Sequence, residues 1–133
     1  MAKKLHLSEI IRKIKKIRFP EFDMIVAIAR DGIMPASLLK DELKLPMHII
    51  WLNYRDENRQ PVREQPALTR PLGRELKGQK NKRILLVDRI SKTGKTISRA
   101  KHILDGNMIR TFVINGKADY SLYSFEECIE IEG

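Results

Sequence analysis

The sequence has almost none of the residues that cross-link a small domain. Cys128 is the one cysteine among 133 residues, so no disulfide can form within the chain. A hydrophobic content of 42% at this length is enough to bury a core without disulfides or metal. We therefore expect a single domain over residues 1–133, in a reducing cytoplasm, with Cys128 as a small buried apolar residue.

Long apolar runs are missing, aromatic residues make up only 6% of the chain, and basic residues outnumber acids. No run reaches the roughly 20 apolar residues of a membrane-spanning helix, and the N-terminus shows no signal-peptide pattern, so we expect no membrane partner. Lysine and arginine number 26 against 17 acids, and this net charge of +9 favours anionic partners or indicates only a soluble basic surface. Nucleic acid is one such partner, but no basic–aromatic motif marks a face for it.

The most informative segment is 84–96, which reads Ile-Leu-Leu-Val-Asp-Arg-Ile-Ser-Lys-Thr-Gly-Lys-Thr. Its apolar start predicts a buried strand over 84–87 that ends at Asp88. The hydroxyls and backbone N–H groups that follow can face an anion at the N-terminus of the next helix, and they belong to Thr93, Gly94 and Thr96. The pattern favours a phosphate-binding loop beside one carboxylate. An ordinary strand, turn and helix is the alternative.

A second segment, residues 25–46, repeats the order of strand, tight turn and helix. The apolar run at its start predicts a strand, and the turn after it is Arg30-Asp31-Gly32. Gly32 allows the backbone to come close to a neighbour. The helix that follows carries three residues toward the core, namely Leu38, Leu39 and Leu43.

Together and in this order, the two segments resemble the signature of the type I phosphoribosyltransferases, closest to the hypoxanthine/xanthine-guanine branch. The resemblance implies a flavodoxin-like, three-layer α/β fold, with a mainly parallel sheet flanked by helices and a truncated hood. The ligand would lie at the C-terminal ends of the strands. The implied reaction is transfer of phosphoribose from 5-phosphoribosyl-1-pyrophosphate (PRPP) to a purine-like nucleobase in nucleotide salvage, with release of pyrophosphate. A homodimer and Mg²⁺ are also implied.

The resemblance assigns roles to individual residues. Asp88 and Lys92 stand at catalytic positions, and Asp88 is the implied metal ligand. The 5′-phosphate and ribose would contact Asp88, Arg89, Ser91, Lys92, Thr93, Gly94, Lys95 and Thr96. The pyrophosphate would contact Arg30, Asp31 and Gly32, and the base would contact Lys117. Three aromatic residues either stack on the base or pack beside a final strand at 127–131, and these are Tyr120, Tyr123 and Phe125.

Residues 53–82 have the composition of an irregular arm. Charged residues alternate there with Pro61, Pro66 and Pro71, which exclude a continuous helix or central strand. So long an irregular segment is typical of a functional loop, and the resembling family has a mobile lid over PRPP at this place. The implied lid contacts are Arg55 and Arg59, with Arg63 and Arg70 as further candidates. A solvated loop is the alternative.

Two residues depart from the family's pattern. Arg89 stands where many relatives carry a second acid, and a cation there repels a metal by about 4 kcal/mol per unit charge at 4 Å in a moderate dielectric. Lys92 replaces an aspartate that works near the base in purine-using relatives, and a protonated lysine cannot accept a proton. A second hypothesis therefore stays open, namely a noncatalytic relative that binds PRPP or a 5′-nucleotide, or that regulates through nucleic acid.

A nucleoside triphosphatase is a weaker alternative. Gly94-Lys95-Thr96 matches the end of a Walker A motif, whose first glycine would fall at residue 89. Arg89 cannot make that turn.

The N-terminal region predicts an amphipathic helix with Ser8 as its N-cap and a solvated basic face. Its apolar face consists of Ile10, Ile14 and Ile17, and Phe19-Pro20 ends it. Further strands are predicted at 47–52 and 111–114, and His102 is expected to be a surface or packing residue.

Overall fold

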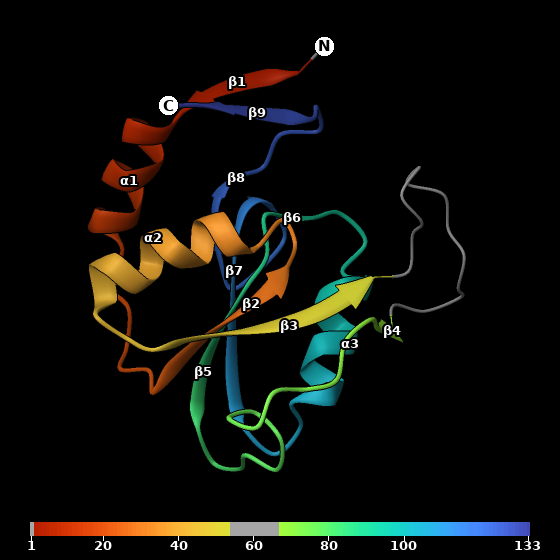
Figure 1. Ribbon diagram of the computed structural model, residues 1–133. Coiled ribbons are helices and arrows are strands. Elements are labelled where there is room, and N and C mark those ends of the chain that lie inside the picture. The colour runs from red at the N-terminus through yellow and green to blue at the C-terminus, as the bar shows by residue number, and fades with distance from the viewer. Residues whose placement is uncertain (1, 54–66) are drawn as a thin grey trace.

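The central sheet of the computed structural model forms where the sequence has its short apolar runs. The model describes residues 2–53 and 67–133 (Figure 1). The strand order is β4–β3–β2–β5–β7–β6, with β8 paired to β7, and β3–β4 is the one antiparallel pair in this sheet among the described residues. The strands are β2 (Met24–Ala29), β3 (Met47–Asn53), β4 (Ala67–Leu68), β5 (Arg83–Val87), β6 (Ile90–Ser91), β7 (Met108–Gly116) and β8 (Tyr120–Tyr123). The mainly parallel sheet is confirmed.

Helices cover both faces of this sheet. Alternate residues of a strand point to opposite faces, so Ile25 and Ala27 pack toward α1 (Leu7–Lys16) and α2 (Ile33–Leu43). Val26 packs on the other face, in the cluster that contains residues of α3 (Lys95–Ile103). Figure 1 shows α3 on one side of the sheet and α1 and α2 on the other. The predicted three-layer fold is therefore confirmed.

The two ends of the chain form a separate two-stranded sheet, here called the terminal sheet. Its strands are β1 (Lys3–His6) and β9 (Ile129–Glu132), which pair in parallel. The terminal sheet lies at the top of Figure 1, apart from the central sheet. The final strand predicted at 127–131 thus begins two residues later and ends one residue later than expected, and its partner is the N-terminal strand.

Two local predictions are wrong. Ser8 is not the N-cap of α1, because β1 leads directly into the helix and His6 occupies the cap position without a side-chain capping bond. Cys128 is exposed rather than buried. Its backbone carbonyl accepts a hydrogen bond from the Lys3 N–H at 2.7 Å, so this residue contributes its main chain to the β1–β9 pairing while its side chain faces solvent.

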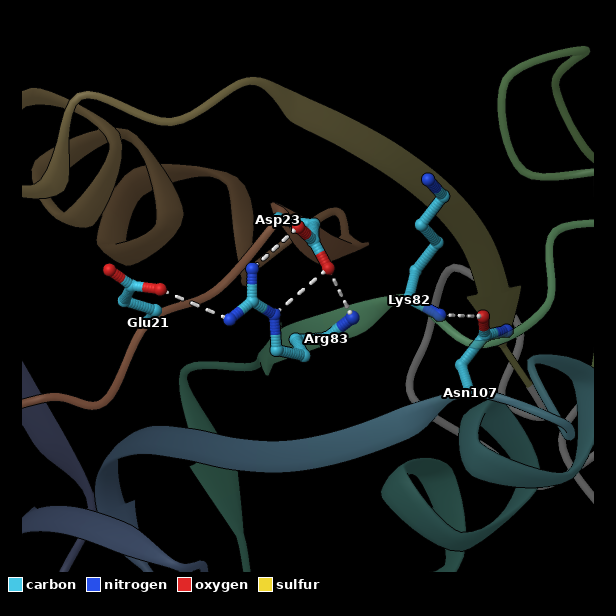
Figure 2. Close-up of polar contacts among 5 residues, drawn as sticks. All are labelled: Glu21, Asp23, Lys82, Arg83 and Asn107. Carbon is cyan, nitrogen blue, oxygen red and sulfur yellow. Dashed lines mark hydrogen bonds and ion pairs between the residues drawn. The ribbon is translucent and has the colours of Figure 1, made fainter.

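The N-terminal ends of β2 and β5 are joined by ionic contacts (Figure 2). The backbone N–H and Nε of Arg83 donate to Asp23 Oδ2 at 2.8 and 3.2 Å, and its Nη2 donates to Asp23 Oδ1 at 3.0 Å. Nη1 of Arg83 also donates to Glu21 at 3.2 Å. Nearby, the Lys82 N–H donates to Asn107 Oδ1 at 3.0 Å. Arg83 is therefore bonded to both acids at this end of the sheet.

Within residues 2–53 and 67–133, none of the helices combines the length and the apolar character that crossing a membrane would require.

Candidate functional site

The two loops singled out in the sequence meet at the C-terminal ends of β2 and β5. The strands are adjacent, with Ala27 in register with Val87, so the turn after β2 lies beside the loop after β5. Gly32 makes this contact possible, because a Cβ at that position would lie 2.5 Å from the carbonyl oxygens of both Ile28 and Val87. Gly32 therefore lets the turn after β2 pack against the end of β5. The Ala29–Arg30 peptide bond in this turn is cis.

Asp88 is the acid that the fold places at this junction. Its backbone N–H donates to Phe112 O at 3.0 Å, and its Oδ1 accepts from the Arg89 N–H at 2.7 Å. Burial raises the pKa of Asp88 to about 7, and the negative charge of Asp31 adds to the rise, while the hydrogen bond from Arg89 opposes it. The Asp31 carboxylate of one loop therefore acts on the Asp88 carboxylate of the other, whose pKa lies near neutral pH. A titrating group held at a strand end is typical of a ligand site.

The loop after β6 presents the N-terminus of α3. Gly94 is the N-cap residue and has φ +78°, a left-handed conformation that favours glycine. The first turn of α3 contains no acid, while Lys92, Thr93 and Lys95 around it are exposed. The one side-chain bond within the loop is long, from the Lys95 N–H to Thr93 Oγ1 at 3.4 Å. This geometry suits an anion at the helix N-terminus.

Two of the predicted contact residues are engaged elsewhere. The side chain of Arg89 reaches the terminal sheet, where its Nη2 donates to Ile129 O at 2.9 Å. Its carbonyl accepts from the N–H groups of Ile114 and Asn115, at 3.0 and 3.1 Å. Ser91 is buried in β6. The Arg89 guanidinium is therefore bound to a main-chain carbonyl of β9.

Lys117 lies beside the phosphate-loop segment. Its backbone N–H donates to Ser91 O at 3.0 Å, and its side chain is exposed. The turn depends on Gly116, which has φ +124° and whose added Cβ would collide with the Ser91 carbonyl. The Asn-Gly pair at 115–116 was the available sequence signal for this contact.

The predicted lid contacts Arg55, Arg59 and Arg63 lie outside the described residues. Arg70 is described, and its guanidinium carbon stacks 3.7 Å from the ring centre of Trp51. Trp51 pairs in register with Ala29, so this stack lies next to the Arg30 turn. The sequence predicts Arg70 only as a further candidate and gives no sign of Trp51, because a stacking partner on a neighbouring strand leaves no local pattern.

The three aromatic candidates for base stacking pack within the protein. The Tyr123 hydroxyl donates to Glu9 Oε1 at 2.9 Å, and its ring stacks on Phe125 with ring centres 5.2 Å apart. Burial and the bond to Glu9 raise the pKa of Tyr123 to about 12. Tyr120 packs edge-on against Phe19 at 4.9 Å. These rings follow the packing alternative.

Solved structures resemble this chain along most of its length. A purine phosphoribosyltransferase from Pyrococcus horikoshii Ot3 is 25% identical, with a TM-score of 0.75 over 96% of this chain and 92% of that one. A hypothetical protein from Neisseria gonorrhoeae with bound ppGpp is 22% identical, with a TM-score of 0.73 over 98% of this chain and 89% of that one. The xanthine-guanine-hypoxanthine phosphoribosyltransferase of Helicobacter pylori is 15% identical, with a TM-score of 0.67 over 98% and 90%.

A sequence comparison with curated proteins gives no match. The family model described as the phosphoribosyl transferase domain matches residues 2–113, which include both loops of the site. The site geometry, the fold and this match agree, and the chain belongs to the phosphoribosyl transferase domain family.

Proposed function

We propose that this protein binds PRPP at the joined ends of β2 and β5 and transfers its phosphoribosyl group to a purine-like nucleobase. The observation that carries the proposal is the contact through Gly32, whose backbone lies against the Val87 carbonyl immediately before Asp88. This contact brings a pyrophosphate-type turn and a phosphate-type loop into one site. The similarity to a purine phosphoribosyltransferase from Pyrococcus horikoshii supports the choice of base.

The 5′-phosphate would lie on the N-terminus of α3. Backbone N–H groups at a helix start, together with the hydroxyls of Thr93 and Thr96, suit a tetrahedral anion. Lys95 supplies a positive charge at the first helical position. Lys92 adds a second exposed cation, and in this site it would bind an anion rather than accept a proton.

The ribose and pyrophosphate would lie between the two loops. Ionised Asp88 would accept a hydrogen bond from a ribose hydroxyl, and Arg30 would face the pyrophosphate. Arg70 is the described lid residue best placed to help, because Trp51 holds it beside that turn. Lys117 would donate to a carbonyl oxygen of the base from the neighbouring turn.

Mg²⁺ fits the donor set at this site. Magnesium binds through one or two carboxylates and otherwise uses water and substrate phosphates. Asp88 and Asp31 are close enough for the charge of one to raise the pKa of the other, and no group of three possible ligands gathers in the part of the chain that the structure describes. When bound, the metal would neutralise charge on the pyrophosphate.

Phosphoribosyl transfer requires that PRPP and the base be held in position and that the charge on the departing pyrophosphate be stabilised. The bond from ribose C1 to the pyrophosphate oxygen breaks, and the pyrophosphate leaves with the bonding electron pair. A base nitrogen forms the new bond to C1 and loses its proton to solvent. The sugar passes through an oxocarbenium-like state. The reaction is therefore accelerated by holding both ends of PRPP and by stabilising the departing pyrophosphate. The residues above correspond to these two tasks.

The test is pyrophosphate release from PRPP and Mg²⁺ with a panel of purine and pyrimidine bases and a control without base. Lys95→Ala is expected to raise the PRPP KM by about tenfold, since it removes a charged contact. Lys101→Ala is the matched control, because it removes the same charge from the exposed end of α3. Absence of base-dependent release from folded wild-type protein would refute the transferase proposal.

A second candidate is a noncatalytic protein that binds a guanosine polyphosphate. The exposed cations Lys92 and Lys95 at the phosphate loop favour it, and the similar Neisseria gonorrhoeae protein has ppGpp bound. Binding of ppGpp to protein that releases no pyrophosphate with any base would select this candidate. A homodimer and a cytoplasmic location stay predictions, and sedimentation analysis would test the first.

A further inference from the structure

Two contacts join the C-terminal residues 125–129, which lead into the terminal sheet, to Arg89 and to its hydrogen-bond partner Asn115. One is the bond from Arg89 Nη2 to Ile129 O at 2.9 Å. The other is a reciprocal pair, in which Asn115 Nδ2 donates to Phe125 O at 3.1 Å and the Phe125 N–H donates to Asn115 Oδ1 at 2.7 Å. Asn115 itself donates its backbone N–H to Arg89 O. Both contacts therefore lead back to the residue after Asp88.

The terminal sheet has little other hydrogen bonding to hold it. Among the described residues, β1 and β9 pair only with each other, and a two-stranded sheet is marginally stable by itself. Leu5 and Ile129 anchor it by packing into the core. Apolar packing is not directional, whereas a guanidinium bonded to a carbonyl fixes distance and orientation. The hydrogen bond from Arg89 to Ile129 is thus a directional contact between β9 and the residue after Asp88.

We propose that Arg89 is a positioning residue that holds the terminal sheet against the phosphate loop, and that it does not contact the ligand. Its backbone N–H orients the Asp88 carboxylate, while its side chain orients β9. A ligand that orders the loop would thereby also order β9, through Arg89. The part of this inference that concerns turnover rests on the proposed function, whereas the tether itself does not.

Hydrogen exchange of the protein without ligand tests the tether. Arg89→Met is expected to speed exchange of the β9 amides by about tenfold, because it removes a charge-assisted hydrogen bond. Amides of β2 and β5 should keep their protection, which would show that the variant is folded. Arg110→Met is the matched control, since Arg110 is an exposed arginine on β7, and it should leave β9 unchanged. Unchanged β9 exchange in folded Arg89→Met would overturn the tether.

Ligand binding tests the coupling. PRPP should slow exchange at 93–96 and in β9 of the wild type, but only at 93–96 in Arg89→Met. A purely structural side chain would leave the response of β9 to PRPP intact. Equal slowing of β9 in both proteins would therefore count against the proposal.

Kinetics separate positioning from ligand contact. Arg89→Met should raise the KM for the base by about tenfold and change the PRPP KM by less than about twofold. Arg89→Asp restores the acid of the resembling family, and we expect it to loosen β9 without a gain in turnover. Higher turnover in Arg89→Asp with unchanged β9 protection would mean that position 89 contacts the ligand. If wild-type protein binds no PRPP, the proposed function fails, while exchange without ligand still supports or refutes the tether.

Discussion

The two ends of the central sheet keep their carboxylates in opposite electrostatic states. At the N-terminal ends of β2 and β5, hydrogen bonds from Arg83 lower the pKa of Asp23 to about 2. At the C-terminal ends of the same strands, burial and the charge of Asp31 raise the pKa of Asp88 to about 7. The strands are shared, so the difference comes from the side chains that each end places around its acid.

The comparison shows which end stabilises the fold, and it favours the other end as the proposed ligand site. A carboxylate paired with a guanidinium is already neutralised and has little left to offer a ligand. A carboxylate buried beside another acid destabilises the folded state when it ionises, and a ligand cation or hydroxyl can relieve that cost. Residues that lower the stability of the folded state are expected at functional sites.

Replacing Asp88 is the strongest test of this contrast. Raising a carboxyl pKa from 3.8 to about 7 costs on the order of 4 kcal/mol of folding stability at neutral pH, so Asp88→Asn should be more stable than wild type by up to that amount. Because the pKa of Asp88 is higher in the folded than in the unfolded state, its contribution to the free energy of unfolding is fully present below about pH 4. That contribution is lost as pH rises through 7. Chemical denaturation from pH 4 to 8 should show a stability gap that widens up to about pH 7 and is then constant. A gap independent of pH would contradict the assignment.

Gly32→Ala tests the geometry of the same end. The added methyl group would meet two backbone carbonyl oxygens at 2.5 Å, and neither can move without shifting β2 or β5. We expect a loss of about 3 kcal/mol in the free energy of unfolding, together with loss of PRPP binding. Gly73→Ala is the control, because its Cβ meets only the flexible Glu75 carboxylate at 3.3 Å, and it should be nearly neutral. Normal PRPP affinity in Gly32→Ala would contradict the proposal that the contact between the two loops forms the PRPP site.

Asp23→Asn examines the opposite end and should have the smallest effect. The folded pKa of Asp23 lies below its ordinary value, so its contribution is present above about pH 4 and is lost as pH falls through about 2. The variant should melt modestly below wild type at neutral pH, and the difference should shrink in acid. Glu21→Gln should change the melting temperature less, since Glu21 makes one exposed contact to Arg83. A melting difference that persists at pH 2 would show that Asp23 acts through packing instead.

The strand and loop at 84–96 were predictable because their determinants are local. An apolar run favours a strand, and Gly94 followed by good helix formers predicts a turn into α3. The same holds for the turn that ends at Gly32. The family match over residues 2–113 agrees with both segments.

Arg89 shows what local reasoning could not supply. Its place in the motif suggested a repulsive cation at the ligand, yet its guanidinium bonds to Ile129, 40 residues away in the chain. Ser8 was expected to cap a helix, but β1 leads directly into α1, and this puts His6 at the cap position and Ser8 inside the helix. In both cases a distant or adjacent strand decided the role of the residue.

By itself, the sequence determined the strand–loop–helix units, the glycines at their turns and the single acid at the end of β5, because hydrophobic periodicity and backbone freedom act within a few residues. The tertiary structure alone decided that Gly32 meets Val87, that Arg70 stacks on Trp51 and that Arg89 bonds to Ile129 in β9. It also decided the charge state of Asp88, since burial and the field of Asp31 arise only when the two loops come together.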